Sequence, residues 1–200
     1  MSGTLLVVVA TEAERPHREE FELLVCGVGK TGAAAATAAR LARGGVRGVV
    51  SFGVAGAYPG EGLAIGDVVV GTEIGVLDEG LDTGERFVPF ARAGMSVPGA
   101  GWLTCDPSLA GAAPSDADFR VVHGRIATVS VCAGNARLAA ERAASGALAE
   151  SMEGAAVAHA ATLFGVPFAE IRGISNLCGP RDGAPFDLAS AVRNAAKVLP

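Results

Sequence analysis

Three short segments of this chain carry side chains that could act on a nucleoside. Glu12 and Glu14 follow the first apolar run, Met152 and Glu153 stand where a helix is expected to begin, and Asn176 ends a strand-like run. A glutamate at a helix start can accept hydrogen bonds from sugar hydroxyls, because the helix dipole favours its ionised form. An amide at a strand end can read the edge of a base. These residue types can bind a small ligand with a sugar and a base, and the alternative is that they are helix-capping and turn residues.

The elements that must position these residues alternate along the chain. Strands are expected at residues 5–10, 23–26, 49–52, 68–72, 121–122, 127–131 and 168–174. Helices are expected at residues 32–43, 135–144, 153–164 and 188–198. Such alternation predicts an α/β fold, with a twisted, mixed but mainly parallel sheet flanked by helices on both sides.

Length and composition predict a single domain over residues 1–200. The chain is 50% hydrophobic and contains 28 glycines, which indicates a substantial core packed closely by small side chains. Residues 79–114 are the exception, because they are rich in Gly, Pro and charged residues without sustained periodicity. We interpret this segment either as a surface loop or as a cover over a site or a partner chain.

Charge and cysteine content restrict the partners. A formal net charge of −5 gives no basic surface for nucleic acid or for an anionic membrane. The apolar runs are too short to span a bilayer, and residues 11–14 interrupt the first before it could act as a signal sequence. The four cysteines are widely spaced and form no CxxC pair, which predicts buried free thiols and no metal site. We expect a cytoplasmic protein with a small-molecule partner.

The glycine-rich run at residues 27–32 satisfies GxGxxG and contains Lys30, so two nucleotide motifs must be weighed. A dinucleotide site needs an acidic residue about twenty positions further on, and no Asp or Glu occurs between residues 23 and 60. A phosphate-binding P-loop needs glycine at position 24, where this chain has Leu24. We therefore interpret the run as a tight strand-to-helix turn and expect no cofactor.

Four segments, in this order along the chain, resemble the purine nucleoside phosphorylase and nucleosidase family. They are residues 9–14, 53–56, 152–153 and 171–176. The resemblance covers nearly the whole chain and is weakest at residues 79–119. It implies a nucleoside phosphorylase-like fold, a nucleoside substrate and a homo-oligomer in which a neighbour contributes to the site. Phe87, Phe90 and Trp102 are candidates for that contact, and packing on their own core is the alternative.

The resemblance also implies roles for individual residues. In this family the last glutamate after the first strand activates the attacking water, which corresponds to Glu14; Glu12 remains an alternative, since either carboxylate could reach a site from this turn. The family's Met-Glu pair corresponds to Met152 and Glu153, with the methionine beside the ribose and the glutamate accepting hydrogen bonds from its hydroxyls.

Two departures from the family pattern concern the nucleophile. Phosphorylases of this family carry Arg-x-Gly-Ser or Arg-x-Gly-Thr where this chain has Ser51 and Val54. Without these ligands a phosphate dianion would be left unbalanced and unpaired, so we expect water as the nucleophile and a hydrolase. An arginine from elsewhere, such as Arg43, Arg86, Arg92 or one from a second subunit, would weaken this expectation.

A third departure concerns the base. Family members that act on methylthioadenosine and S-adenosylhomocysteine end their Arg-x-Ile-Ser-Asp motif with an aspartate that protonates adenine, whereas this chain has Ser175 and Asn176. An amide cannot act as a general acid, but it can pair with both the carbonyl and the ring N–H of a 6-oxopurine. The expected leaving base is therefore a 6-oxopurine, and the resemblance implies hypoxanthine, with Asp182 assisting its protonation through water.

The remaining contacts of the expected site are with the rest of the substrate. Val54, Ala55 and Gly56 follow a buried strand, where glycines allow a ligand to approach the backbone. Arg181, or alternatively Arg172, could bind a carboxylate on the 5′ side of the substrate. Rival hypotheses are a phosphorylase for inosine-like substrates, a nucleosidase for adenine nucleosides, and a nucleoside-binding sensor without catalysis.

Overall fold

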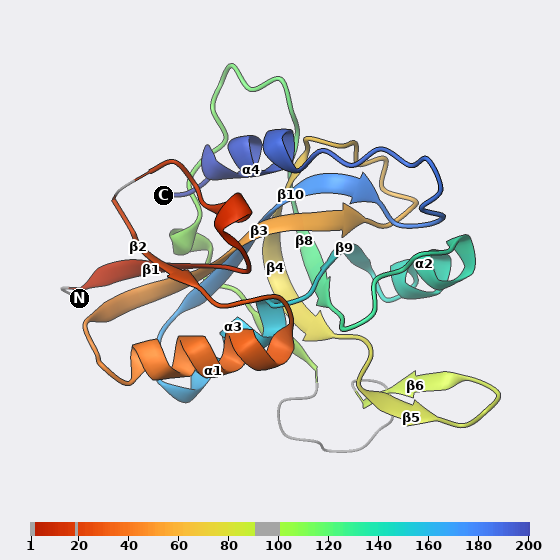
Figure 1. The fold of residues 1–200 in the computed structure, drawn as a ribbon, viewed down its shortest axis with the longest axis horizontal. Helices are drawn as coiled ribbons and strands as arrows, with labels where there is room; N and C mark the ends of the chain where they lie inside the picture. The colour runs from red at the N-terminus through yellow and green to blue at the C-terminus, as the bar shows by residue number, and fades with distance from the viewer. Residues whose placement is uncertain (1–2, 19, 91–100) are drawn as a thin grey trace.

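A computed structural model of the chain describes residues 3–18, 20–90 and 101–200. Its central sheet contains β1 (Thr4–Val9), β2 (Glu22–Val25), β3 (Val46–Ala57), β4 (Val68–Val76), β7 (Trp102–Thr104), β8 (Val121–Thr128), β9 (Ala147–Ser151) and β10 (Phe168–Leu177). The helices are α1 (Lys30–Leu41), α2 (Ala136–Ala143), α3 (Gly154–Leu163) and α4 (Leu188–Ala196), with short 3₁₀ turns η1 (Glu12–Glu14) and η3 (Pro107–Leu109). A small hairpin of β5 (Gly80–Asp82) and β6 (Phe87–Pro89) projects from the sheet (Figure 1).

The sheet is mixed and curls on itself. Its strand order is β10-β4-β8-β9-β3-β1-β2, with β7 beside β4, and β10 also pairs with β3. The pairs β1–β2, β1–β3, β3–β10, β4–β8 and β8–β9 are parallel, whereas β4–β10, β3–β9 and β4–β7 are antiparallel. The predicted α/β class and mainly parallel sheet are therefore confirmed.

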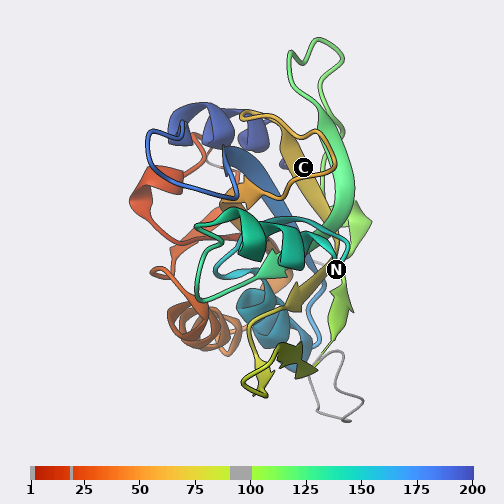
Figure 2. The same ribbon diagram turned by 90° about the vertical axis from the view of Figure 1, so that its right-hand side faces the viewer.

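Both faces of the sheet are covered, as the run of apolar residues in β1 requires. Leu5 and Val7 of β1 point into one core, which α4 closes with Val192. Leu6 and Val8 point into the opposite core, which is shared with α1 and α3. Figure 2 shows α4 and α3 on opposite sides of the sheet. The alanine-rich sequence of α3 allows this helix to lie close to the strands it covers.

Two expectations about the strands were wrong. The expected strands at residues 121–122 and 127–131 form one strand, β8, which ends at Thr128. Strand β9 was not expected at all.

The long segment 79–114 holds the β5–β6 hairpin, β7 and η3 in its described part. Residues 91–100, with Arg92, lie outside the described residues. In the described part of the chain, no helix is long and apolar enough to cross a membrane.

Candidate active site

A cavity of about 280 Å³ lies at the carboxyl ends of β1, β3, β9 and β10. Ligand sites of open α/β sheets commonly occupy such a place, because loops that leave neighbouring strands meet there. Its lining includes nine residues that the sequence singled out: Glu14, Val54, Ala55, Gly56, Met152, Glu153, Ser175, Asn176 and Arg181. The structure thus brings together residues from the first and last thirds of the chain.

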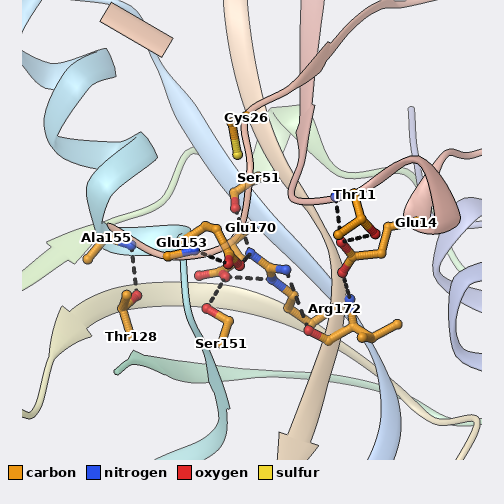
Figure 3. A network of polar contacts seen from close by, with 12 residues as sticks. Thr11, Glu14, Cys26, Ser51, Thr128, Ser151, Glu153, Ala155, Glu170 and Arg172 are labelled. Carbon is orange, nitrogen blue, oxygen red and sulfur yellow. Dashed lines mark hydrogen bonds and ion pairs between the residues drawn. The ribbon is translucent and has the colours of Figure 1, made fainter. Parts of the chain in front are cut away.

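Glu14 enters the cavity from η1, directly after β1. Its carboxylate accepts hydrogen bonds from the backbone N–H of Thr11 at 3.1 Å, from the Thr11 hydroxyl at 3.3 Å and from the backbone N–H of Val54 at 3.1 Å (Figure 3). Glu14 is buried, whereas the Glu12 side chain is 68% exposed and pairs with Arg15 at 2.9 Å. The arrangement favours Glu14 over Glu12 as the carboxylate of this site.

Glu153 faces the same cavity from the residue before α3. Its Oε1 accepts a hydrogen bond from the backbone N–H of Gly29 at 2.9 Å, and its Oε2 lies 3.6 Å from Nη2 of Arg172. Gly29 has φ +96°, a conformation that glycine adopts without strain. The glycine-rich turn that superficially resembled a nucleotide motif therefore orients a carboxylate of the site. Its Lys30 is occupied elsewhere, with Nζ 2.9 Å from both Asp78 and Glu79.

A buried arginine joins the carboxylates of this site. Arg172 donates from Nε to Glu170 at 2.7 Å and from Nη2 to the Ser51 hydroxyl at 2.9 Å. Burial would lower the pKa of Arg172, but Glu170, Glu153 and Glu14 raise it, so the guanidinium stays charged. Its burial and its pairing with Glu170 and Glu153 disfavour the alternative of Arg172 as a ligand for a carboxylate on the 5′ side.

The charges of the site disfavour phosphate. Arg172 is paired with two carboxylates, and a dianion beside it would also meet Glu14. Two of the arginines that could replace the missing phosphate ligands are exposed. Arg43 lies between α1 and β3, and Arg86 lies in the β5–β6 hairpin. In the described part of the chain, Arg181 is the only cation on the cavity lining, on an exposed loop.

The amide of Asn176 lies at the end of β10 and is almost fully buried. Its Oδ1 accepts a hydrogen bond from the Ser175 hydroxyl at 3.0 Å, and its Nδ2 donates to the carbonyl of Leu177 at 3.2 Å. A Cβ at Gly56 would lie 2.9 Å from Nδ2, so glycine at this position leaves room for the amide. Both edges of the amide keep further hydrogen-bonding capacity for a ligand.

The loop after β10 supplies the outer wall of the cavity. Arg181 and Phe186 line it, and both are exposed. Asp182 is exposed on the same loop but is not among the lining residues, so it could act on a bound base only through intervening water. The structure therefore separates Asp182 from the other expected site residues.

A covalent mechanism through a thiol is disfavoured by the surroundings of the cysteines. All four are free, and Cys26 lies beside the carboxylate cluster (Figure 3). Burial, followed by Glu153, raises the pKa of Cys26 to about 11, so the thiol stays protonated near neutral pH. The expectation of buried thiols holds for Cys105 alone, since Cys26 and Cys178 are half-buried and Cys132 is exposed. Burial of the thiol group nevertheless raises the pKa of Cys132.

Comparisons with known proteins identify the family of the chain. The family model of the phosphorylase superfamily matches residues 1–199. Futalosine hydrolase of Streptomyces coelicolor is 38% identical over 197 residues, which cover 91% of this chain and 80% of that protein. Futalosine hydrolase of Acidothermus cellulolyticus is 38% identical over 187 residues, with 88% and 72% covered.

A solved structure shares the fold. The 5′-methylthioadenosine/S-adenosylhomocysteine nucleosidase of Neisseria meningitidis, in complex with methylthio-immucillin-A, has a TM-score of 0.77 and 26% identity. The match covers 97% of this chain and 95% of that structure. The chain belongs to the phosphorylase superfamily. Within it, the chain is similar to the futalosine hydrolases of Streptomyces coelicolor and Acidothermus cellulolyticus over most of its length.

Proposed function

We propose that this protein hydrolyses the N-ribosidic bond of futalosine and releases hypoxanthine and dehypoxanthine futalosine. The 38% identity to two futalosine hydrolases supports this substrate. The observation that carries the choice of water over phosphate is the pairing of Arg172 with Glu170 and Glu153, because the charge of this buried cation is already balanced and the other cation of the described cavity lining, Arg181, lies on an exposed loop. Such an activity belongs to the alternative pathway of menaquinone biosynthesis.

The proposed reaction uses two carboxylates with different tasks. Cleavage of an N-glycosidic bond passes through an oxocarbenium-like state, with positive charge on the sugar and negative charge on the departing base. Glu14, held by three hydrogen bonds, takes a proton from the attacking water. Glu153 accepts hydrogen bonds from the ribose hydroxyls, and Met152 packs against the sugar.

The base is bound at the other end of the proposed site. Asn176 pairs with the carbonyl and ring N–H of hypoxanthine, and Ser175 fixes the orientation of its amide through the 3.0 Å hydrogen bond. The backbone of Val54, Ala55 and Gly56 borders the substrate along β3. Asp182 assists protonation of the base through water, and Arg181 is the proposed partner of a carboxylate on the 5′ side.

The assembly and location of the protein are also part of the proposal. We expect a homo-oligomer, since Phe87 and Trp102 line a second cavity of about 400 Å³ beside α2 that a second copy could cover. Phe90, next to β6, is half-buried. We further expect a cytoplasmic location and a small-molecule substrate. Light scattering of the purified protein tests the assembly, and a monomer at micromolar concentration would contradict it.

A panel of substrates tests the choice of base and sugar. Purified protein is incubated with futalosine, inosine and methylthioadenosine, and the released base is separated by chromatography. The proposal predicts hypoxanthine from futalosine at a much higher kcat/KM than any base from the other two. Preferential release of adenine would contradict the role given to Asn176, and tight binding of futalosine without any product would indicate a sensor.

A further inference from the structure

Glu170 is a buried carboxylate that the proposed reaction does not use. It stands in the middle of β10, is 0% exposed and is not among the residues that line the cavity. A charged side chain is almost never buried to this extent unless it is paired. The role of Glu170 can therefore be inferred from its contacts.

All hydrogen bonds of Glu170 in the described structure fall on one oxygen. Its Oε1 accepts from Nε of Arg172 at 2.7 Å and from the Ser151 hydroxyl at 2.8 Å, whereas Oε2 has no partner among the described residues (Figure 3). A Cβ at Gly154 would lie 2.1 Å from Oε2. The first residue of α3 is therefore a glycine that leaves space for this carboxylate.

Oε2 of Glu170 thus has no partner among the described residues, whereas Oε1 holds Arg172. Its 2.7 Å bond has the length of a charge-assisted hydrogen bond, and the Arg172 guanidinium favours the ionised form of Glu170 against the burial that raises its pKa. Because Nε is tied to Glu170, Nη2 is directed toward Ser51 and Glu153, at 2.9 Å and 3.6 Å, and Nη1 donates to the carbonyl of Val54 at 3.5 Å. Glu170, outside the cavity, thus fixes a cation that contacts Glu153 of the cavity lining.

We propose that Glu170 is a positioning residue for the hydrolysis: it fixes the Arg172 guanidinium and takes up part of its charge. Glu14 and Glu153 then remain less attracted to Arg172 and act on water and ribose as basic carboxylates. This inference rests on the proposed function. Without Glu170, the full positive charge of Arg172 would face the other two carboxylates and make Glu14 a weaker base.

Other titratable groups near Glu170 do not replace it. Arg172, Ser151 and Glu153 face it from β10, from β9 and from the start of α3, and Cys105 faces it from the segment before η3. Burial, followed by Glu170, raises the pKa of Cys105 to about 12, so this thiol is neutral near pH 7. Burial raises the pKa of Glu170 itself, and the Arg172 and Ser151 contacts oppose that rise.

The test is the pH profile of futalosine hydrolysis by Glu170→Gln. The amide keeps an oxygen for Arg172 and Ser151 but removes the charge. We expect kcat to fall roughly tenfold, because a weaker base accepts the proton of water less readily. We also expect the acid limb of kcat/KM to move down by about one pH unit. A purely structural role would not move that limb.

A matched control and a second variant complete the test. Glu22→Gln removes the same charge from a partly exposed ion pair between Glu22, at the start of β2, and Arg40. This variant should leave the pH profile unchanged. If Glu170→Gln does not fold, Glu170→Asp keeps the charge but withdraws it from Nε of Arg172. We expect this variant to lower kcat roughly tenfold with little change in KM.

The outcomes separate the two proposals. Folded Glu170→Gln with wild-type kcat and an unchanged acid limb would overturn the positioning role, as would wild-type kcat in Glu170→Asp. Wild-type protein that does not cleave futalosine would instead reject the proposed function, whatever the variants do.

Discussion

The backbone N–H of Val54 donates a hydrogen bond of 3.1 Å to the Glu14 carboxylate. Val54 stands where a phosphorylase of this family would carry a hydroxyl for phosphate. The side chain of Val54 has no hydroxyl that could bind phosphate. Its backbone N–H instead holds the carboxylate of Glu14. The bond joins β3 to η1 and directs Glu14 into the cavity.

Removal of the Glu14 charge should abolish most of the activity. Glu14→Gln is expected to lower kcat by about 10²–10⁴-fold, since a neutral amide cannot accept a proton from water. Glu12→Gln is the matched control, because Glu12 is exposed and pairs with Arg15, and it should retain wild-type kcat. Steady-state rates with futalosine measure both. Full turnover by Glu14→Gln, or equal losses in both variants, would contradict the assignment.

Asn176 should determine which purine is released. Asn176→Asp introduces a carboxyl that can protonate adenine and removes the donor for the carbonyl of hypoxanthine. The ratio of kcat/KM for hypoxanthine-containing over adenine-containing nucleosides is expected to fall by at least about tenfold. The ratio is measured with futalosine and methylthioadenosine. An unchanged ratio in a folded variant would mean that other groups select the base.

Gly53 should be required for the arrangement of Glu14 and Arg172. A Cβ at this position would lie 2.4 Å from Oε1 of Glu14 and 2.7 Å from Nη1 of Arg172. Gly53→Ala should therefore lower kcat at least about tenfold by displacing one of these groups. Gly134→Ala, where a Cβ would meet nothing within 4 Å, is the control. Equal activity of the two variants would show that the cluster tolerates the shift.

Asp67 should make stability depend on pH. Burial raises its pKa, but hydrogen bonds from Ala64, from the Arg120 backbone and from the Arg120 side chain outweigh burial and lower it. A lowered pKa contributes stability that is present above the unfolded value of about 3.9 and is lost as pH falls through the folded value. Asp67→Asn should cost about 1–3 kcal/mol near pH 7.

The pH series decides this prediction. Urea unfolding of wild type and Asp67→Asn should give a constant difference in the free energy of unfolding from about pH 5 to pH 8. The difference should shrink below about pH 4, where the carboxyl of the unfolded chain becomes protonated, and should be lost below the lower pKa of the folded protein. A difference that persists unchanged at low pH would show that Asp67 acts through packing rather than charge.

The class of the fold and its four main helices could be predicted from the sequence, because buried strands and alanine-rich helices leave clear apolar runs. The error at β8 has a physical cause. Gly124 interrupts the apolar run of β8, and a Cβ there would lie 2.3 Å from Cδ1 of Leu148 in β9. The glycine marks close packing of two strands rather than a break, and a single sequence does not distinguish these.

The carboxylates Glu14 and Glu153 were predictable only through the family resemblance, whereas the central place of Arg172 was missed. Arg172 contacts Ser51, Glu153 and Glu170. Ser51 lies in β3 and Glu153 directly before α3, so neither contact is apparent from the sequence around Arg172. One signal was available. Glu170 and Arg172 alternate within an apolar strand run, so they share one face, and charges buried on a strand must pair.

The nucleophile is the central claim, and the sugar product tests it most directly. Purified protein is incubated with futalosine in buffers with and without inorganic phosphate, and both the base and the sugar product are quantified. Water as the nucleophile predicts hypoxanthine at the same rate in both buffers, with an unphosphorylated dehypoxanthine futalosine. Cleavage that requires phosphate and yields a sugar 1-phosphate would contradict the account and would show that the charge of Arg172 is available to a dianion.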